Sequence, residues 1–509
     1  MQDISPFLIL AIIGGYFLFL MLISYVTSRG SQSEDFFVGG RESPWYVVAF
    51  GMIGATLSGV TFISVPGFVG DTQFSYMQVV FGYIVGYFII AFVLMPMYYR
   101  LRLTSIYTYL EKRFGWRAYK TGAAYFLLSR SIGAAFRLFL VAIVLQQFLM
   151  EPLGVPFAVT ILIAIGLIWI YTFRGGIKTI VWTDTLQTAS MLFAVVATIF
   201  YIGKEMDLGA WEIVETVRQS ELSKTWFFEG GWSDSQNFIK QFLSGVFITI
   251  VMTGLDQDMM QKNLSCRNLR DAQKNMLTLS GVLVVANLLF LSLGALLYIY
   301  AANLGIEMPT RMVNGEAIPA SDLLYPTMAL GYLSPAIGIV FLIGLIAAAY
   351  SSADSALTAL TTSFCIDFLG FEKSDQSEEK KKRRRLFVHL GFSFILFIII
   401  MIFYYINDQA VIQALFRIAG YTYGPLLGLY AFGFFIDRQV RDKLIPIVCI
   451  LAPLISLVID TYSETLLWGY KFGFEILILN GVITFVGLWL VSKSEQADAS
   501  LLSKHALKV

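Results

Sequence analysis

Residues Ala347 to Ser355 read Ala-Ala-Ala-Tyr-Ser-Ser-Ala-Asp-Ser and lie inside an apolar run from about residue 337 to about residue 368. On a helix, side chains three, four and seven positions apart share one face. That face carries Ala348, Ser351, Ser352 and Ser355, with Asp354 beside it and Thr358 and Thr362 continuing it. The stripe is typical either of a cavity lining or of hydroxyls that bond back to helix carbonyls or join helices together.

The oxygens of this stripe suit a hard monovalent cation such as sodium, which is held by oxygen ligands rather than by nitrogen or sulfur. Adjacent hydroxyls and a free main-chain carbonyl supply such ligands. Asp354 favours a functional site, because a carboxylate at membrane depth costs roughly 2.5 to 3.5 kcal/mol on insertion scales.

The composition predicts a membrane protein that crosses the bilayer many times. Of 509 residues, 57% are hydrophobic and 14% are charged, against about 25% charged in soluble domains. Three scattered cysteines and two histidines provide neither a disulfide framework nor a zinc site. A net charge of +1 gives no reason to expect a nucleic-acid partner. Without a cluster of catalytic groups at one depth, we predict no enzyme activity.

A spanning helix needs about 20 mainly apolar residues, and on that criterion we predict an all-α fold of about 13 transmembrane helices. The spans run approximately 6–27, 44–70, 76–98, 121–150, 156–172, 180–203, 237–256, 275–302, 333–367, 387–406, 410–436, 444–461 and 472–491. Lysine and arginine number 27 in one set of connections and 6 in the other. The cation excess marks the cytoplasmic side, so we expect the N-terminus outside and the C-terminus inside the cytoplasmic membrane.

Two of these spans are interrupted by small and polar residues. The second contains Gly54, Ser58 and Pro66-Gly67, and the seventh runs through Thr249 and Gly254 into Asp256-Gln257-Asp258. Two interrupted spans, each leading a group of five, indicate an inverted-repeat transporter with its site at the discontinuities. The alternative is that the glycines only allow close helix packing.

Asp184 lies about four residues into the sixth span, which follows a tight turn predicted at Gly175-Gly176. No cation stands near it in sequence. The carboxylate therefore indicates either a bound cation or an ion pair with an arginine on another helix.

Four segments together resemble the sodium:solute symporter family. They are Asp35-Phe-Phe-Val-Gly-Gly-Arg41, Tyr171-Thr-x-x-Gly-Gly-x-x-x-x-x-Trp-Thr-Asp184-x-x-Gln187, Gly254-x-Asp-Gln257-x-x-x-Gln261-Lys262 and Ser351-Ser-Ala-Asp-Ser355. The resemblance implies a LeuT-like fold in one transporter domain, with two inverted five-helix repeats at 44–203 and 237–436. One extra helix (6–27) would precede them, and two more (444–491) and a cytoplasmic tail (492–509) would follow.

The resemblance also implies site residues. A first sodium site would use Gly54, Leu57, Ala348, Ser351 and Ser352. A second would use Asp184, Ser351, Asp354 and Ser355, although some members have a serine at the position of Asp354. Substrate-binding residues would be Thr56, Ser58, Thr61, Gln78, Arg137, Thr249 and Tyr421.

The positions that bind sugar in some members fall here on Thr61, Val80, Thr249 and Leu283, which do not supply the same hydrogen bonds, so a galactose-like substrate is not expected. Arg130 and Arg137 lie about two turns apart on nearly one face. A guanidinium binds a carboxylate in bidentate fashion, which favours a carboxylate-bearing solute. The alternative is that either arginine pairs with Asp184 or Asp354.

The sequence thus predicts sodium-coupled symport of a small polar solute, such as an organic anion, amino acid, vitamin or sugar derivative, by a monomer in the lipid bilayer. Sodium and solute must favour the same conformer for such coupling. The first alternative is proton coupling through Asp354 or Asp184. A sensor or channel is a further alternative, although the predicted tail is short for a sensor.

Overall fold

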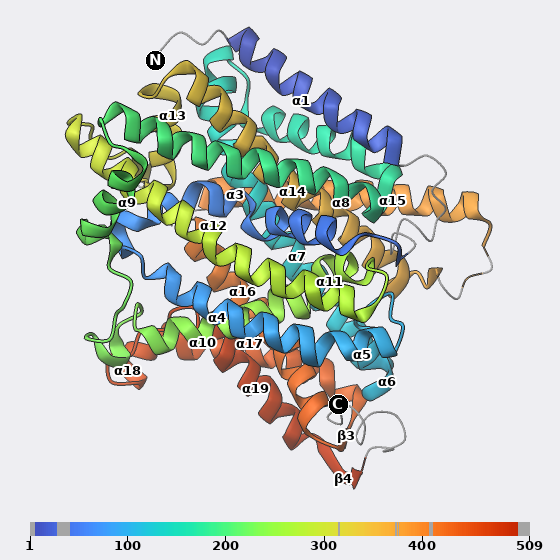
Figure 1. Ribbon diagram of the computed structural model, residues 1–509. Coiled ribbons are helices and arrows are strands. Elements are labelled where there is room, and N and C mark those ends of the chain that lie inside the picture. The colour runs from blue at the N-terminus through green and yellow to red at the C-terminus, as the bar shows by residue number, and fades with distance from the viewer. Residues whose placement is uncertain are drawn as a thin grey trace.

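The computed structural model describes residues 6–27, 41–313, 316–371, 374, 376–406 and 411–496. Long helices lie side by side in a bundle, with α1 at one edge and α17–α19 at the other (Figure 1). The segment 35–40 of the first family pattern and the end of the tail lie outside the described residues.

The longer helices follow the predicted spans closely. They are α1 (Pro6–Thr27), α3 (Trp45–Thr72), α4 (Tyr76–Ile89) with η2 (Ile90–Leu94) and α5 (Met95–Arg100), α7 (Trp116–Leu145) with η3 (Gln146–Met150) and η4 (Glu151–Leu153), α8 (Phe157–Glu205), α10 (Phe238–Thr249) with η7 (Ile250–Gly254), α11 (Gln257–Leu264), α12 (Leu269–Asn303), α14 (Pro335–Ser363) with η9 (Phe364–Phe368), α15 (Glu378–Ile406), α16 (Val411–Phe435), α17 (Ile445–Thr461) and α19 (Ile476–Leu490).

The connections contain short elements. These are α6 (Thr108–Arg113), α9 (Ala210–Gln219), η5 (Glu221–Ser223), η6 (Gly231–Ser233), η8 (Ser321–Leu323), α13 (Leu324–Gly331), η11 (Asp442–Leu444) and α18 (Ser463–Leu466). Strands β1 (Thr310–Val313) and β2 (Glu316–Pro319) pair antiparallel, as do β3 (Arg438–Val440) and β4 (Ser492–Gln496). The fold is otherwise helical in the part described.

Within the described residues, nine helical segments are long and apolar enough to cross a membrane. Three shorter apolar helices accompany them, at Ala11–Thr27, Phe157–Ile170 and Ile476–Leu490. The 25-residue helix α16 adds a further element of membrane-spanning length. The exact number of 13 crossings and the inverted arrangement of the repeats stay predictions.

Helix α8 contains two of the predicted spans and folds back on itself. Along α14, Tyr350 donates its hydroxyl hydrogen to the carbonyl of Ala164, while Gly344 packs against Ala194. Six positions on α14 cover about 9 Å, whereas 30 positions on a straight α8 would cover about 45 Å. The chain therefore reverses between Ala164 and Ala194, as a turn between the fifth and sixth spans requires.

The centre of the bundle is formed by α3 and α8, which pack against each other and against both α12 and α14. Almost every side chain of α3 is buried. A Cβ atom at Gly54 would overlap the hydroxyl of Thr188 on α8, so this glycine does allow close packing, as the alternative interpretation held. Close packing and a helix break therefore occur in the same helix, a few residues apart.

Both predicted helix breaks are confirmed by the backbone. In α3, Ser58 has φ 37° and ψ 172°, which no helical residue adopts. In the seventh span, η7 ends at Gly254, and Asp256 is extended with φ −107° and ψ 122°. The Asp256 carboxylate accepts from the amides of Asp258 and Met259 at 3.0 and 3.3 Å and so caps the start of α11.

Candidate functional site

The serine stripe on α14 meets the broken helix α3. The hydroxyl of Ser351 lies 3.3 Å from the carbonyl oxygen of Gly54 and 3.3 Å from that of Ala348. The hydroxyl of Ser352 is fully buried and has no hydrogen-bond partner among the described residues. Leu57 directly precedes the break at Ser58, where the i→i−4 bonding of a helix is interrupted. The Ser351 hydroxyl thus meets two main-chain oxygens, with Ser352 next to it in sequence on α14 and Leu57 three positions beyond Gly54 on α3.

This donor set fits sodium. Every polar atom in it is oxygen, and a hydroxyl buried without a partner costs free energy that a cation ligated there would recover. The alternative was that hydroxyls on α14 bond to carbonyls of their own helix. Thr361 does so, because its hydroxyl donates to Leu357 O at 2.7 Å. The Ser352 hydroxyl forms no such bond.

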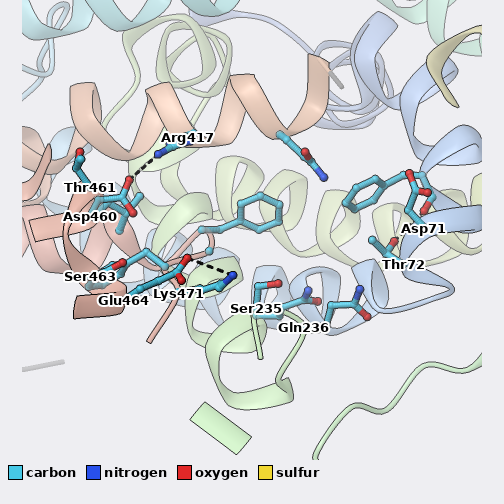
Figure 2. A pocket seen from close by; sticks show the side chains of 17 residues that line it. Asp71, Thr72, Ser235, Gln236, Arg417, Asp460, Thr461, Ser463, Glu464 and Lys471 are labelled. Atoms are coloured by element: carbon cyan, nitrogen blue, oxygen red, sulfur yellow. Dashed lines mark hydrogen bonds and ion pairs between the residues drawn. The ribbon is translucent and has the colours of Figure 1, made fainter. Parts of the chain in front are cut away.

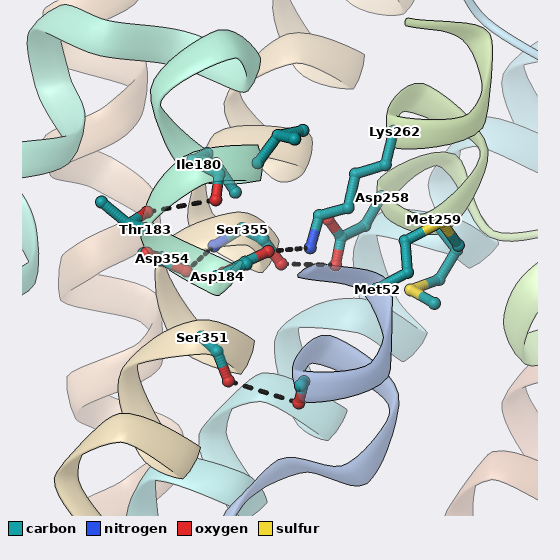
Figure 3. A network of polar contacts seen from close by, with 12 residues as sticks. Met52, Ile180, Thr183, Asp184, Asp258, Met259, Lys262, Ser351, Asp354 and Ser355 are labelled. Atoms are coloured by element: carbon teal, nitrogen blue, oxygen red, sulfur yellow. Dashed lines mark hydrogen bonds and ion pairs between the residues drawn. The ribbon is translucent and has the colours of Figure 1, made fainter. Parts of the chain in front are cut away.

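The residues expected at a second cation site have other partners. Asp184 forms an ion pair with Lys262, Nζ to Oδ2 at 2.6 Å, with both side chains buried (Figure 3). The hydroxyl of Ser355 donates to Asp258 Oδ2 at 3.0 Å, and the Ser355 amide donates to Asp354 Oδ1 at 2.5 Å. The ion-pair alternative for Asp184 was right in kind, but the partner is a lysine and not an arginine.

Arg130 does not pair with Asp184 or Asp354 in the described contacts. Its guanidinium contacts Asp258 directly and lies 4.0 Å from Asp256. Tyr423 on α16 donates to the same Asp256 carboxylate at 2.7 Å. This buried cluster joins α7, α11, α14 and α16, and it neutralises the charge of Arg130.

A small central cavity of about 70 Å³ lies at the two helix breaks. Its lining includes the predicted substrate residues Thr56, Ser58, Thr61, Arg137 and Thr249. Arg137 is buried, its Nε has no hydrogen-bond partner, and no ion pair involves it within the described chain. Among the described lining residues, Arg137 is therefore a guanidinium that forms no ion pair.

Sequence reasoning did not assign several polar residues that line this cavity, among them Asn287. Asn287 on α12 lines it, donates its amide to Leu283 O at 2.7 Å, and leaves its side-chain oxygen buried without a partner. An asparagine within an apolar spanning helix is a signal that could have identified it.

Two predicted substrate residues do not line the cavity. Gln78 binds the connection between α8 and α10 instead, donating to Gln236 O at 2.9 Å and accepting from the Phe227 amide at 3.2 Å. Tyr421 donates to Asp460, which also pairs with Arg417 at 3.0 Å. Helix rotation turns both side chains away from the breaks, which residue type alone does not reveal.

A second, larger cavity of about 700 Å³ lies beside the central one (Figure 2). Its lining contains the ion pairs Arg417–Asp460 and Lys471–Glu464, at 3.0 and 3.1 Å. Phe416 lines the central cavity and Phe474 the larger one, and their ring centroids are 4.8 Å apart. Tyr76, which also lines the central cavity, has its ring centroid 6.5 Å from that of Phe416. These three rings form an aromatic layer where the linings of the two cavities meet.

Two broken helices with an oxygen cluster and a small central cavity between them define the class of secondary transporters, in which ion and solute bind at the discontinuities. The chain belongs to the sodium:solute symporter family, whose family model matches residues 36–442. It is therefore a multi-pass membrane transporter and not an enzyme, and its coupling ion is sodium.

Individual relatives agree with this assignment. The chain is 26% identical to a sodium/sialic acid symporter of Proteus mirabilis, over 97% of this chain and 98% of that protein. It is 27% identical to a sodium/sialic acid symporter of Aliivibrio fischeri, over 84% and 83% of the two chains.

Solved structures show the same fold. A structure of a Na⁺-coupled sialic acid symporter, in a substrate-bound outward-open state, aligns with a TM-score of 0.79 at 21% identity, covering 96% of this chain and 99% of that one. A nucleobase-cation-symport-1 family transporter aligns with a TM-score of 0.55 at 14% identity, covering 90% and 94%.

Proposed function

We propose that the protein uses inward sodium movement to accumulate a solute that carries one carboxylate and several hydroxyl or amide groups, with sialic acid as the first candidate. The single observation that carries this proposal is Arg137, a buried guanidinium beside the helix breaks with no ion pair among the described residues. A carboxylate is the natural bidentate partner for that group.

The neighbouring charges support a monoanion. Arg130 also lines the cavity, but Asp258 and Asp256 already neutralise it. A dianionic solute would need two cations that form no ion pair within the protein. Among the described lining residues, only Arg137 is such a cation. The free oxygen of Asn287 and the hydroxyls of Thr61 and Thr249 supply hydrogen bonds for the uncharged part of the solute.

Sodium would bind between two parts of the bundle, with Gly54 and Leu57 on α3 and Ala348, Ser351 and Ser352 on α14. Bound there, it would hold these helices in the arrangement that presents Arg137 and Ser58 to the solute. Sodium and solute would then favour the same conformer, which is the condition for coupling.

The cavity sizes fit a state that is closed around the central site. About 70 Å³ is far below the roughly 300 to 1,000 Å³ of a solute-binding pocket. Phe416 would therefore move away from Tyr76 and Phe474 to admit the solute from the larger cavity. The cation distribution in the connections supports placing that cavity outside the cell, with the N-terminus outside and the C-terminus inside.

Sequence reasoning offered proton coupling as an alternative, with Asp184 as one carrier. The ion pair with Lys262 gives Asp184 a different role.

The test is uptake by the purified protein in liposomes with an inward sodium gradient. We expect accumulation of sialic acid, no accumulation of its methyl ester, and no accumulation when potassium replaces sodium. Transport of neutral sugars in preference to carboxylates, or uptake driven by a pH gradient without sodium, would refute the proposal.

A further inference from the structure

A lysine ammonium is paired with Asp184, one of the residues at which the sequence led us to expect a second sodium ion. Lys262 on α11 and Asp184 on α8 are 78 residues apart in sequence, and their charged atoms are 2.6 Å apart (Figure 3). Their side chains are 1% and 0% exposed. The pair is therefore neutral in sum and shielded from water.

The second oxygen of Asp184 also has a partner. With the Gln187 side-chain nitrogen turned toward it, the amide donates to Oδ1 at 3.2 Å and to the Thr183 carbonyl at 3.3 Å. Both carboxylate oxygens thus have donors that come from the protein itself.

The remaining expected ligands are engaged as well. The Ser355 hydroxyl donates to Asp258, and one oxygen of Asp354 accepts from the Ser355 amide. Ser351 belongs to the first site through Gly54 and Ala348. A second sodium would have to displace these contacts.

We propose that Lys262 serves as a tethered cation in the second cation position, so that one sodium ion accompanies each solute molecule. The inference rests on the proposed first sodium site. A buried carboxylate needs a counter-charge, and Lys262 supplies it. A sodium ion added to the same carboxylate would place two like charges together in a low-dielectric interior, where their repulsion is strong.

The pair also joins the two halves of the bundle without sodium. Asp184 lies in the part of α8 that packs against α3 near Gly51 and Gly54, and Lys262 follows the break in the seventh span. The ammonium thus holds α11 against α8 by a bond that stays within the protein, whereas sodium at Ser351 and Ser352 leaves with the solute.

The stoichiometry of the wild-type protein is the first measurement. Reversal of uptake in liposomes at set sodium and solute gradients gives the number of sodium ions per solute. The dependence of melting temperature on sodium concentration reports binding independently of transport, because each bound ion stabilises by mass action. We expect one ion per solute, and a Hill coefficient of about one, since the coefficient is limited by the number of sites.

Substitutions separate the tethered cation from a merely structural ion pair. Lys262→Met leaves Asp184 without its counter-charge, so we expect a second sodium dependence, with a Hill coefficient rising toward about two. The matched control is the neutral pair Lys262→Met with Asp184→Asn, which should return the coefficient to about one. Lys262→Arg retains the charge and should behave as the wild type.

Two wild-type sodium ions per solute would overturn the proposal. So would a folded Lys262→Met protein whose sodium dependence equals that of the neutral double variant. If Lys262→Met does not fold, the proposal is tested by the wild-type stoichiometry and by the sodium dependence of Lys262→Arg. Complete absence of sodium stabilisation in the wild type would instead refute the first site, and with it the proposed function.

Discussion

The hydroxyl of Ser351 lies 3.3 Å from the carbonyl oxygen of Gly54, although the two residues are 297 positions apart in sequence. This contact joins the serine stripe of α14 to the residues just before the break in α3. It brings together one hydroxyl and two main-chain oxygens, and the next residue on α14, Ser352, has a buried hydroxyl without a partner among the described residues.

Removing the Ser352 hydroxyl should abolish the sodium response. In Ser352→Ala, we expect the sodium-dependent rise in melting temperature and the sodium stimulation of uptake to be lost, because one cation ligand is missing. Thr358→Val is the matched control, since Thr358 also has a buried hydroxyl without a partner in the described structure. Equal loss in both variants would point to general destabilisation and against a sodium site.

Replacing Arg137 should remove solute binding. We expect Arg137→Gln to weaken carboxylate binding by about 30-fold or more, equivalent to about 2 kcal/mol, the lower range for truncating a buried charged pair. Arg137→Lys should recover part of the affinity, because it retains charge but not the bidentate geometry. Calorimetric titration in saturating sodium measures both. Wild-type affinity in the Gln variant would show that the carboxylate binds elsewhere.

A substitution at Thr188 should offset the loss of stability caused by a substitution at Gly54. A Cβ atom at Gly54 overlaps the Thr188 hydroxyl, so Gly54→Ala should destabilise the protein by about 1 to 3 kcal/mol through overpacking. Thr188→Ala removes the overlapping atom, and the double variant should regain stability relative to Gly54→Ala. The measurement compares the melting temperatures of the wild type, the two single variants and the double variant. Strictly additive effects would mean that the two residues do not meet.

Phe416 should control access from the larger cavity to the central one. In Phe416→Ala, we expect a cysteine introduced at Ser58 to react faster with a charged thiol reagent added outside, because the aromatic layer between the cavities is opened. The three native cysteines, Cys266, Cys365 and Cys449, are buried and provide a low background. Gln413→Ala is the control, since Gln413 lines only the larger cavity. Identical rates in all three proteins would place the barrier elsewhere.

Much of the fold could be predicted because its determinants are local. Apolar runs of about 20 residues predict spans, and the glycines and hydroxyls around Ser58 and Gly254 predict the breaks that the backbone shows. Helical periodicity placed Ser351 and Ser352 on one face. Arg137 was identified because an arginine at membrane depth needs a partner or a ligand.

The pairing of these groups depended on the tertiary structure. Asp184 pairs with Lys262, Arg130 pairs with Asp258, and Gln78 binds the connection between α8 and α10. A 3.6-residue period fixes which side chains share a face, but not how the helix is rotated or at what depth it meets its neighbours. Sequence therefore determined which oxygens and charges lie within the membrane, while helix packing decided which of them meet, because such contacts join residues 78 to 297 positions apart.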